Sequence, residues 1–326
     1  MKIAIHNTLV DGSFTERWVR YCQNNKIDFE LVDAYSSDIV QQLEGFTGFM
    51  WHHSQVNYKD ALFAKQLLYS LELKGIKVFP NFYTTWHFDD KVGQKYLLEA
   101  IDAPFVPTHV FFSKESASNW IETVGFPKVF KLRGGAGSIN VKLVDSRQEA
   151  RKLIIKAFGR GFPQYDKIGS LRERLRKWKQ GNGSIINVCK GLGRFFIPNE
   201  FSKFRSNEIG YVYFQDYIPN NKDDTRIVVI GDKAFGVKRL VRKNDFRASG
   251  SGLLVYDRRQ IDERCVEIAF KICRKMKSQS IAVDFVFDDI GNPLILEVSY
   301  GFYSSSYDPC EGYWDEKMNW YSGKNF

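Results

Sequence analysis

The stretch that most constrains this chain is residues 280–300, which read SIAVDFVFDDIGNPLILEVSY. Residues 281–287 and 293–298 are two apolar runs rich in β-branched and aromatic side chains. They flank the turn-forming residues 288–292, DDIGN. Apolar runs separated by such a turn predict an antiparallel hairpin.

The register of this hairpin decides which side chains face each other. A turn centred between Ile290 and Gly291 pairs Asp284 with Glu297 and places Ser299 on the same sheet face. Like charges in such a pair are destabilising by themselves, so the two acids predict a cation between them. Oxygen ligands suit a hard ion such as Mg²⁺. The alternative, an exposed hairpin whose acids are simply solvated, stays open on these residues alone.

Length and composition describe a folded globular protein. The 326 residues are enough for two or three packed units, and 44% of them are hydrophobic and 15% aromatic. No stretch reaches the roughly 18 uninterrupted apolar residues of a membrane-spanning helix, and the apolar run at the start is too short for a signal peptide. We therefore expect a cytoplasmic protein without a membrane span.

Five cysteines form no CxxC pair, which favours free thiols over a disulfide framework or a zinc site. Cys265 and Cys273 fall in a helical pattern over residues 262–277, in which Val266, Ala269, Phe270 and Cys273 form one apolar stripe. We expect both to be core or core-edge residues rather than nucleophiles.

The net charge of +9 indicates an anionic partner. Residues 159–205 carry eleven Lys and Arg against three Asp and Glu, with a helical pattern near residues 171–180. This basic segment predicts either a solvated surface or a docking surface for an acidic substrate. Nucleic-acid binding is a third hypothesis, and it is not favoured.

Residues 1–83 alternate short apolar runs with helical stretches, a rhythm that predicts βαβ units and a parallel sheet. The turn after the first run lacks G-x-G-x-x-G, so dinucleotide binding is not supported.

The pattern changes after residue 83. Thr85 is expected to cap a helix over residues 87–101. Residues 126–133 and 139–144 then read as strands around the glycine-rich turn 134–138, GGAGS. Backbone N–H groups in such a turn can bind phosphate, although an ordinary flexible hairpin loop has the same composition. Ser146 and Glu149 have capping-box spacing and begin a helix through residue 158.

A further strand is predicted over residues 211–217, and residues 225–230 and 233–240 form a second hairpin. Cationic side chains lie on and just after this hairpin: Arg226, Lys238, Arg239, Arg242 and Arg247.

Together these segments resemble the ATP-grasp superfamily, and most closely its ribosomal-protein glutamate ligase and glutathione synthetase-like carboxylate–amine ligases. The resemblance covers residues 84–301 and rests on four ordered blocks. These are Asp90-Lys91; Val129-Phe130-Lys131 with the glycine turn; residues 214–218, FQDYI, followed by Asp224-Thr225-Arg226; and Val283-Asp284 with residues 296–299, LEVS.

The resemblance implies a fold of mixed α/β and α+β class. A Rossmann-like domain over residues 1–83 would precede a two-lobed ATP-grasp fold. Its first lobe would cover residues 84–214 with the glycine-rich flap and the basic segment, and its second lobe residues 215–326 with the metal site and an aromatic tail.

The resemblance also implies an ATP site. Lys91 and Lys131 would contact the phosphates, and Gln215, Asp216 and Ile218 would bind adenine, largely through backbone groups. Asp224 would contact the ribose. The flap residues that would close over the phosphates are Gly134, Gly135, Gly137 and Ser138.

The remaining roles concern the reaction. Arg226, Lys238, Arg239 and Arg247 would neutralise the transferred phosphate or hold the acceptor carboxylate. Asp284, Glu297 and Ser299 would carry Mg²⁺. The family commonly has asparagine where this chain has Ser299, which weakens the inference of a second metal ion.

The implied activity is an ATP-dependent carboxylate–amine ligase that forms an amide through an acyl phosphate. The basic segment and aromatic tail suggest an acidic glycan precursor or a peptide carboxylate as acceptor. The alternative is a non-catalytic ATP-binding or scaffold protein of the same fold. Homo-oligomerisation stays open.

Overall fold

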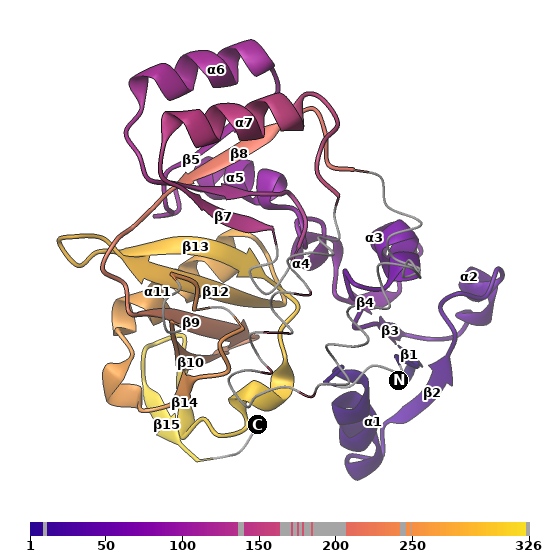
Figure 1. The fold of residues 1–326 in the computed structure, drawn as a ribbon. Coiled ribbons are helices and arrows are strands. Elements are labelled where there is room, and N and C mark those ends of the chain that lie inside the picture. Colours follow the sequence, from indigo (N-terminus) through magenta and orange to yellow (C-terminus); the bar gives the residue numbers. More distant parts are fainter. Residues whose placement is uncertain are drawn as a thin grey trace. The chain divides into compact units, whose positions relative to one another are not determined.

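The computed structural model of the chain describes residues 1–8, 12–135, 140–163, 207–241, 246–248 and 250–323, together with 171, 175, 178 and 184 (Figure 1). The described chain divides into two compact units. Unit 1 comprises residues 1–88, 96–105 and 220–326, and unit 2 comprises residues 89–95 and 106–219. Both compact units are discontinuous in sequence, so they do not test the predicted domain boundaries. Those boundaries, after residues 83 and 214, remain a prediction.

Unit 1 begins with the predicted parallel sheet. Its strands are β1 (Lys2–His6), β2 (Asp28–Val32), β3 (Gly48–Met50) and β4 (Lys77–Phe79), paired in the order β2-β1-β3-β4. The helices between them are α1 (Thr15–Asn24), α2 (Ile39–Gln42) and α3 (Tyr58–Leu73). All the pairings are parallel, which confirms the βαβ prediction.

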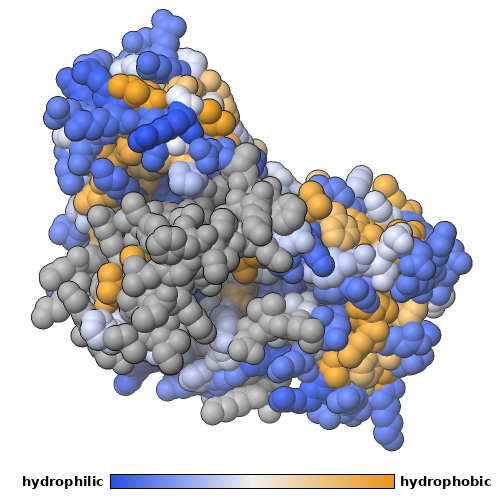
Figure 2. Space-filling view, turned by 45° about the vertical axis from the view of Figure 1, so that its right-hand side comes forward, coloured by the Kyte–Doolittle hydropathy of each residue, from blue (hydrophilic) through white to orange (hydrophobic). Residues whose placement is uncertain are grey.

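Helix α3 is apolar on more than one side. Ala64, Leu68 and Leu71 are buried in the core with Phe49 and Trp51. Other apolar side chains of the same helix are exposed: Leu62, Tyr69 and Leu73. Figure 2 shows that hydrophobic residues gather in patches on the exposed surface.

The larger sheet of unit 1 is antiparallel. In the described residues its strands pair in the order β13-β12-β9-β10-β14-β15, and β11 pairs with β10. The bounds are β9 (Asp223–Ile230), β10 (Lys233–Leu240), β11 (Leu254–Val255), β12 (Ser280–Phe287), β13 (Pro293–Ser299), β14 (Gly312–Asp315) and β15 (Trp320–Ser322). Among the described residues, the 3-10 helix η1 (Arg258–Gln260) lies between β11 and the helix that follows it, and η2 (Ser304–Tyr307) lies between β13 and β14.

Helix α11 (Glu263–Lys275) packs on β9 and β12 through the predicted apolar stripe. Asp262 caps its first turn by accepting a hydrogen bond from the backbone N–H of Arg264. Cys265 and Cys273 are buried, which confirms their assignment to the core. Burial raises the pKa of Cys265 to about 12 and that of Cys273 to about 11, so neither thiol is a ready nucleophile at neutral pH.

The hairpin β12–β13 pairs Asp284 with Glu297, as predicted, but its turn is centred on a different position. Phe287 pairs with Pro293 and Phe285 with Ile295, which centres the turn on Ile290. A β-bulge between Asp284 and Phe285 then shifts the register by one residue. Without it Asp284 would lie opposite Leu296.

Unit 2 contains a second antiparallel sheet with the order β5-β8-β6-β7 among the described residues. Its strands are β5 (Thr108–Phe111), β6 (Lys128–Lys131), β7 (Val141–Val144) and β8 (Val212–Asp216). Helices α6 (Lys114–Thr123) and α7 (Arg147–Ala157) pack together, and Ile121 and Ile154 enter the core of this unit. Ser146 caps α7, as its spacing with Glu149 predicted.

The helix expected over residues 87–101 begins later, and Thr85 is the last residue of a separate short helix rather than its cap, which corrects that prediction. A short helix, α4 (Phe82–Thr85), is capped by Asn81, and α5 begins only at Lys91 and ends at Ala100. Asp89 lies between them with φ of +56°, a left-handed conformation that interrupts a helix. Within the described residues no helix is long and apolar enough to cross a membrane.

Candidate active site

The predicted phosphate-binding lysines lie in unit 2. Lys131 ends β6 and Gln215 lies on the adjacent β8, where the Lys131 ammonium donates to the Gln215 amide oxygen at 2.6 Å. Both side chains are buried, with exposed fractions of 5% and 1%. The Lys131 ammonium is a charge-assisted hydrogen-bond donor, the kind of group that binds anionic ligands.

The second lysine is held against the glycine-rich turn. The Lys91 ammonium donates to the carbonyl oxygen of Gly135 at 2.7 Å, and the Lys91 backbone N–H donates to the Arg133 carbonyl at 3.0 Å. The Gly135 N–H donates to the Asp89 carboxylate at 2.6 Å. The structure therefore brings Lys91 to the start of the predicted flap, with Asp89 as a partner that sequence reasoning missed.

Other flap residues fall outside the described part of the chain. Gly134 and Gly135 are described, whereas Gly137 and Ser138 lie in the gap at residues 136–139. Most of the basic segment, including most of the predicted helix near residues 171–180, likewise lies outside the described residues.

The side chains of two residues predicted to bind adenine point to different faces of the sheet. Gln215 and Asp216 are consecutive on β8, so their side chains point to opposite faces. Asp216 accepts a hydrogen bond at 2.6 Å from Lys128, its cross-strand partner, on the face where Trp120 also lies. A ligand on one face of this strand would meet only one of the two side chains, which agrees with adenine binding through backbone groups. Ile218 follows the strand and is half-buried.

Unit 1 contains a four-residue ion-pair cluster, which we call the Asp284 cluster: Asp224 and Arg226 of β9, Arg239 of β10 and Asp284 of β12. Arg226 lies directly opposite Asp284, and Arg239 lies directly opposite Asp224. The strand periodicity places Asp224 and Arg226 on one face because they are two residues apart. Acids and bases therefore alternate across three neighbouring strands.

The hydrogen bonds of the Asp284 cluster are short and paired. Arg226 donates through Nε and Nη2 to the two Asp284 oxygens, at 2.5 and 2.7 Å. Arg239 donates through Nε and Nη2 to Asp224, both at 2.6 Å, and Nη2 also donates to Asp284 Oδ2 at 2.7 Å. Such fork-to-carboxylate contacts are stronger than hydrogen bonds between neutral groups, because both partners are charged and two bonds form in parallel.

Burial makes these pairs electrostatically important. Asp284 and Asp224 are each 4% exposed and Arg239 is 7% exposed. Burial raises the pKa of Asp284, but the Arg226 and Arg239 guanidinium groups outweigh this effect and hold the pKa well below its usual range. Asp284 is therefore ionised at any physiological pH. Beside the cluster, burial raises the pKa of Tyr307 to about 12 against the lowering effect of Arg226 and Arg239.

The hairpin places the predicted metal ligands on one sheet face. Glu297 lies opposite Asp284, and Ser299 lies opposite Ala282. The Ser299 hydroxyl donates to the Gly301 carbonyl at 3.0 Å and accepts from the Gly301 N–H at 3.2 Å. Ser299 thus stabilises the turn that leaves β13.

The donor set fits a hard cation that needs few protein ligands. Among the described residues no three or more His, Cys, Asp or Glu side chains gather as a metal site. Mg²⁺ usually takes one or two carboxylates and completes its shell with water and phosphate, which the Asp284–Glu297 pair can satisfy. Asp284 already accepts hydrogen bonds from two arginines, so a metal ion would have to share or replace them.

Of the two other predicted cations, Lys238 faces away from this arrangement. Lys238 is adjacent to Arg239 on β10, so it points to the opposite sheet face, where it pairs with Asp223 at 3.1 Å. Arg247 lies in the short described segment 246–248 and is half-buried. Strand alternation was available from the sequence and could have separated Lys238 from Arg239.

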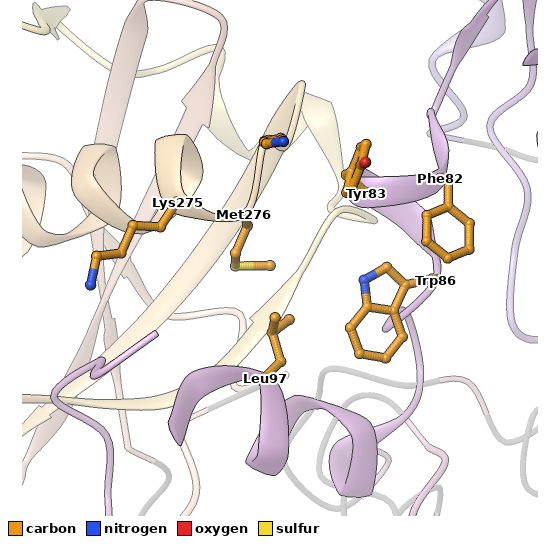
Figure 3. Close-up of a pocket in the computed structure, with 7 residues that line it drawn as sticks. Phe82, Tyr83, Trp86, Leu97, Lys275 and Met276 are labelled. Carbon is orange, nitrogen blue, oxygen red and sulfur yellow. The ribbon is translucent and has the colours of Figure 1, made fainter. Parts of the chain in front are cut away.

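A separate pocket of about 500 Å³ lies within unit 1. It is lined by Phe82, Tyr83, Trp86, Leu97, Lys275, Met276 and Lys277. Figure 3 shows the Met276 side chain and the Trp86 indole pointing into it, with Leu97 on the opposite wall. None of the predicted site residues lines this pocket, so we do not assign it to the nucleotide.

Comparison with known proteins places these residues in context. Residues 203–305 match the RimK-like ATP-grasp domain family, a segment that contains the whole Asp284 cluster, Glu297 and Ser299. The alpha-aminoadipate–LysW ligase LysX of Saccharolobus solfataricus is 21% identical over 85% of this chain and 85% of its own length. The ribosomal protein bS6–L-glutamate ligase of Escherichia fergusonii is 26% identical over 64% of this chain and 55% of its own length.

Solved structures give the same fold. A RimK domain ATP-grasp protein from Sphaerobacter thermophilus has a TM-score of 0.55 at 16% identity and covers 94% of both chains. The D-alanine–D-alanine ligase of Bacillus anthracis complexed with ATP has a TM-score of 0.56 at 14% identity, over 92% of this chain and 86% of its own. The predicted fold is therefore confirmed, and the predicted resemblance is confirmed by the match of residues 203–305 to the RimK-like ATP-grasp domain family.

Proposed function

We propose that this protein is an ATP-dependent carboxylate–amine ligase that forms an amide through an acyl phosphate. The observation that carries the proposal is the Asp284 cluster with Glu297 opposite Asp284, inside the segment that matches the RimK-like domain. Buried guanidinium groups beside oxygen ligands are suited to a reaction in which phosphoryl charge must be neutralised. The ligase names of the relatives support the same class.

In this proposal the lysines of unit 2 hold the nucleotide. Lys131 would donate to phosphate oxygens from its buried position beside Gln215, and Lys91 would hold the start of the flap through Gly135. The adenine would lie against the backbone of residues 215–218. Positioning of this kind supplies most of the catalysis in phosphoryl transfer, because there is little covalent chemistry for the protein to perform.

The residues of unit 1 would handle the reacting groups. Arg226 and Arg239 would stabilise the negative charge of the transferred phosphoryl group and of the acceptor carboxylate, and Asp224 orients Arg239 through a bidentate pair. Asp284 and Glu297 would hold Mg²⁺, with Ser299 shaping the turn beside them. When bound, Mg²⁺ would neutralise charge on the phosphates.

The names of the relatives narrow the substrates to test. Both name an acidic amino acid, α-aminoadipate or glutamate, together with a second partner, LysW or ribosomal protein bS6. We propose that the amine substrate is an amino acid and that the acceptor is a peptide or protein carboxylate, with an acidic glycan precursor as the alternative suggested by the basic segment.

The test is ADP release from the full chain with Mg²⁺ and ATP, across a panel of amines and carboxylates, followed by product mass. A matched pair should stimulate ADP release and yield a product heavier by the amine less one water. Glu297→Gln should abolish the stimulation, whereas Asp223→Asn, on the opposite sheet face, should retain it. Release of ADP that no amine or carboxylate stimulates would overturn the ligase proposal.

A second candidate is a non-catalytic ATP-binding protein of the same fold. It is favoured by Ser299 in place of the family's usual asparagine and by the engagement of Ser299 with Gly301. Tight Mg·ATP binding without turnover for any substrate pair would support it, and sustained turnover would reject it.

A further inference from the structure

The Asp284 carboxylate is already engaged by hydrogen bonds from within the protein. Both of its oxygens accept hydrogen bonds from Arg226, and Oδ2 also accepts one from Arg239. A carboxylate offers roughly four lone-pair positions, so guanidinium N–H groups fill most of them. A divalent cation at the same oxygens would lie next to two positive groups.

Geometry keeps the arginines in place. Arg226 lies directly opposite Asp284 across β9 and β12, so the pair is built into the sheet register. Arg239 is anchored from its other side by both oxygens of Asp224. All of these side chains except Arg226 are more than nine-tenths buried, and the Arg226 side chain is 20% exposed. Arg226 is therefore the more solvent-accessible of the two arginines.

We propose that Arg226 and Arg239 lock Asp284 against divalent metal ions in the nucleotide-free protein. The phosphate groups of a nucleotide offer the guanidinium groups an alternative anionic partner, and their transfer to phosphate frees the carboxylate. Metal and nucleotide therefore bind together rather than in sequence. This inference rests on the proposed function for its nucleotide, but the lock itself is a property of the protein alone.

The lock predicts a direct effect on metal affinity without any substrate. The full-length protein is titrated with Mn²⁺ alone, and bound metal is measured by electron paramagnetic resonance. Wild-type protein should bind Mn²⁺ weakly at this position. Arg226→Gln should bind it about tenfold more tightly or better, the effect of removing one competing charge-assisted partner of about 1.4 kcal/mol.

Two further variants show where the gain arises. Arg226→Lys retains the positive charge but loses the two-point contact, so its affinity should lie between those of the wild type and Arg226→Gln. The double variant Arg226→Gln with Asp284→Asn should lose the gain completely. Near-ultraviolet circular dichroism of each variant reports whether the tertiary packing is retained.

The outcomes separate the lock from the proposed ligase activity. Mn²⁺ affinity that is unchanged or weaker in a folded Arg226→Gln protein would overturn the lock, as would a gain that survives Asp284→Asn. Absence of Mn²⁺ binding in wild type and every variant would also overturn it. None of these measurements depends on turnover, so failure of the ligase proposal would appear separately, in the ADP-release assay.

Discussion

Arg226 lies directly opposite Asp284 on the neighbouring strand, and the two side chains form a two-point ion pair with N–O distances of 2.5 and 2.7 Å. Asp284 therefore has a cross-strand neighbour on each side, Arg226 on β9 and Glu297 on β13. The attraction between Arg226 and Asp284 offsets the repulsion expected between Asp284 and Glu297.

Removing the acid from this pair should destabilise the fold. Asp284→Ala leaves Arg226 and Arg239 buried beside a missing counter-charge, which costs about 3–5 kcal/mol in free energy of unfolding. Urea unfolding followed by tryptophan fluorescence measures the change. Asp223→Ala is the control, because its pair with Lys238 is more exposed and should contribute less than about 1 kcal/mol. Equal losses in the two variants would contradict the argument.

Lys131→Met should weaken ATP binding by about 10- to 100-fold, the loss of one charge-assisted contact of about 1.5–3 kcal/mol. Isothermal titration calorimetry with a non-hydrolysable ATP analogue gives the affinity. Lys142→Met on the adjacent β7 is the control, because the Lys142 side chain is 52% exposed and faces Glu149. Wild-type affinity in the Lys131 variant would remove this residue from the nucleotide site.

The protein should lose stability as the pH falls below about 6.5 because three histidines are held neutral. Burial lowers the pKa of His52 to about 4, that of His87 to about 3 and that of His53 well below its usual value. The unfolded chain takes up protons first, so the contribution is complete above about pH 6.5 and declines as pH falls toward the folded-state values.

The expected slope is about 1.4 kcal/mol per pH unit for each histidine. Urea midpoints measured between pH 7.5 and 5 give the slope. His52→Gln keeps an acceptor for the Phe14 N–H, which His52 Nδ1 accepts at 3.1 Å, but it cannot titrate. The dependence of its unfolding free energy on pH should be weaker by the contribution of one histidine. An unchanged dependence would show that His52 does not contribute.

Gly312→Ala should destabilise unit 1 by about 1–3 kcal/mol, the usual effect of overpacking. A Cβ atom at position 312 would lie 2.1 Å from the backbone oxygen of Tyr321 on β15, which cannot move without breaking the β14–β15 pairing. Thermal unfolding measures the effect. Gly125→Ala is the control, because a Cβ there meets nothing within 4 Å, and a stable Gly312 variant would mean that β15 adapts.

Local patterns in the sequence predicted much of the fold because they depend on neighbouring residues. The alternation of apolar runs and helical stretches over residues 1–83 predicted the parallel sheet. Ser146 and Glu149 predicted the start of α7, and the two apolar runs predicted β12 and β13. The break between α4 and α5 was not predicted, since nothing in a helical pattern shows that Asp89 adopts a left-handed conformation.

The sequence by itself determined that Asp284 and Glu297 share a hairpin, that cations follow on a second hairpin, and that Lys131 precedes a glycine-rich turn. Only the tertiary structure decided which cations reach the acids. Arg226 meets Asp284 because β9 pairs with β12, and Arg239 joins them because β10 pairs with β9, whereas Lys238 is turned away by strand alternation. These pairings join residues up to 58 positions apart, and no local pattern specifies which strand lies beside which.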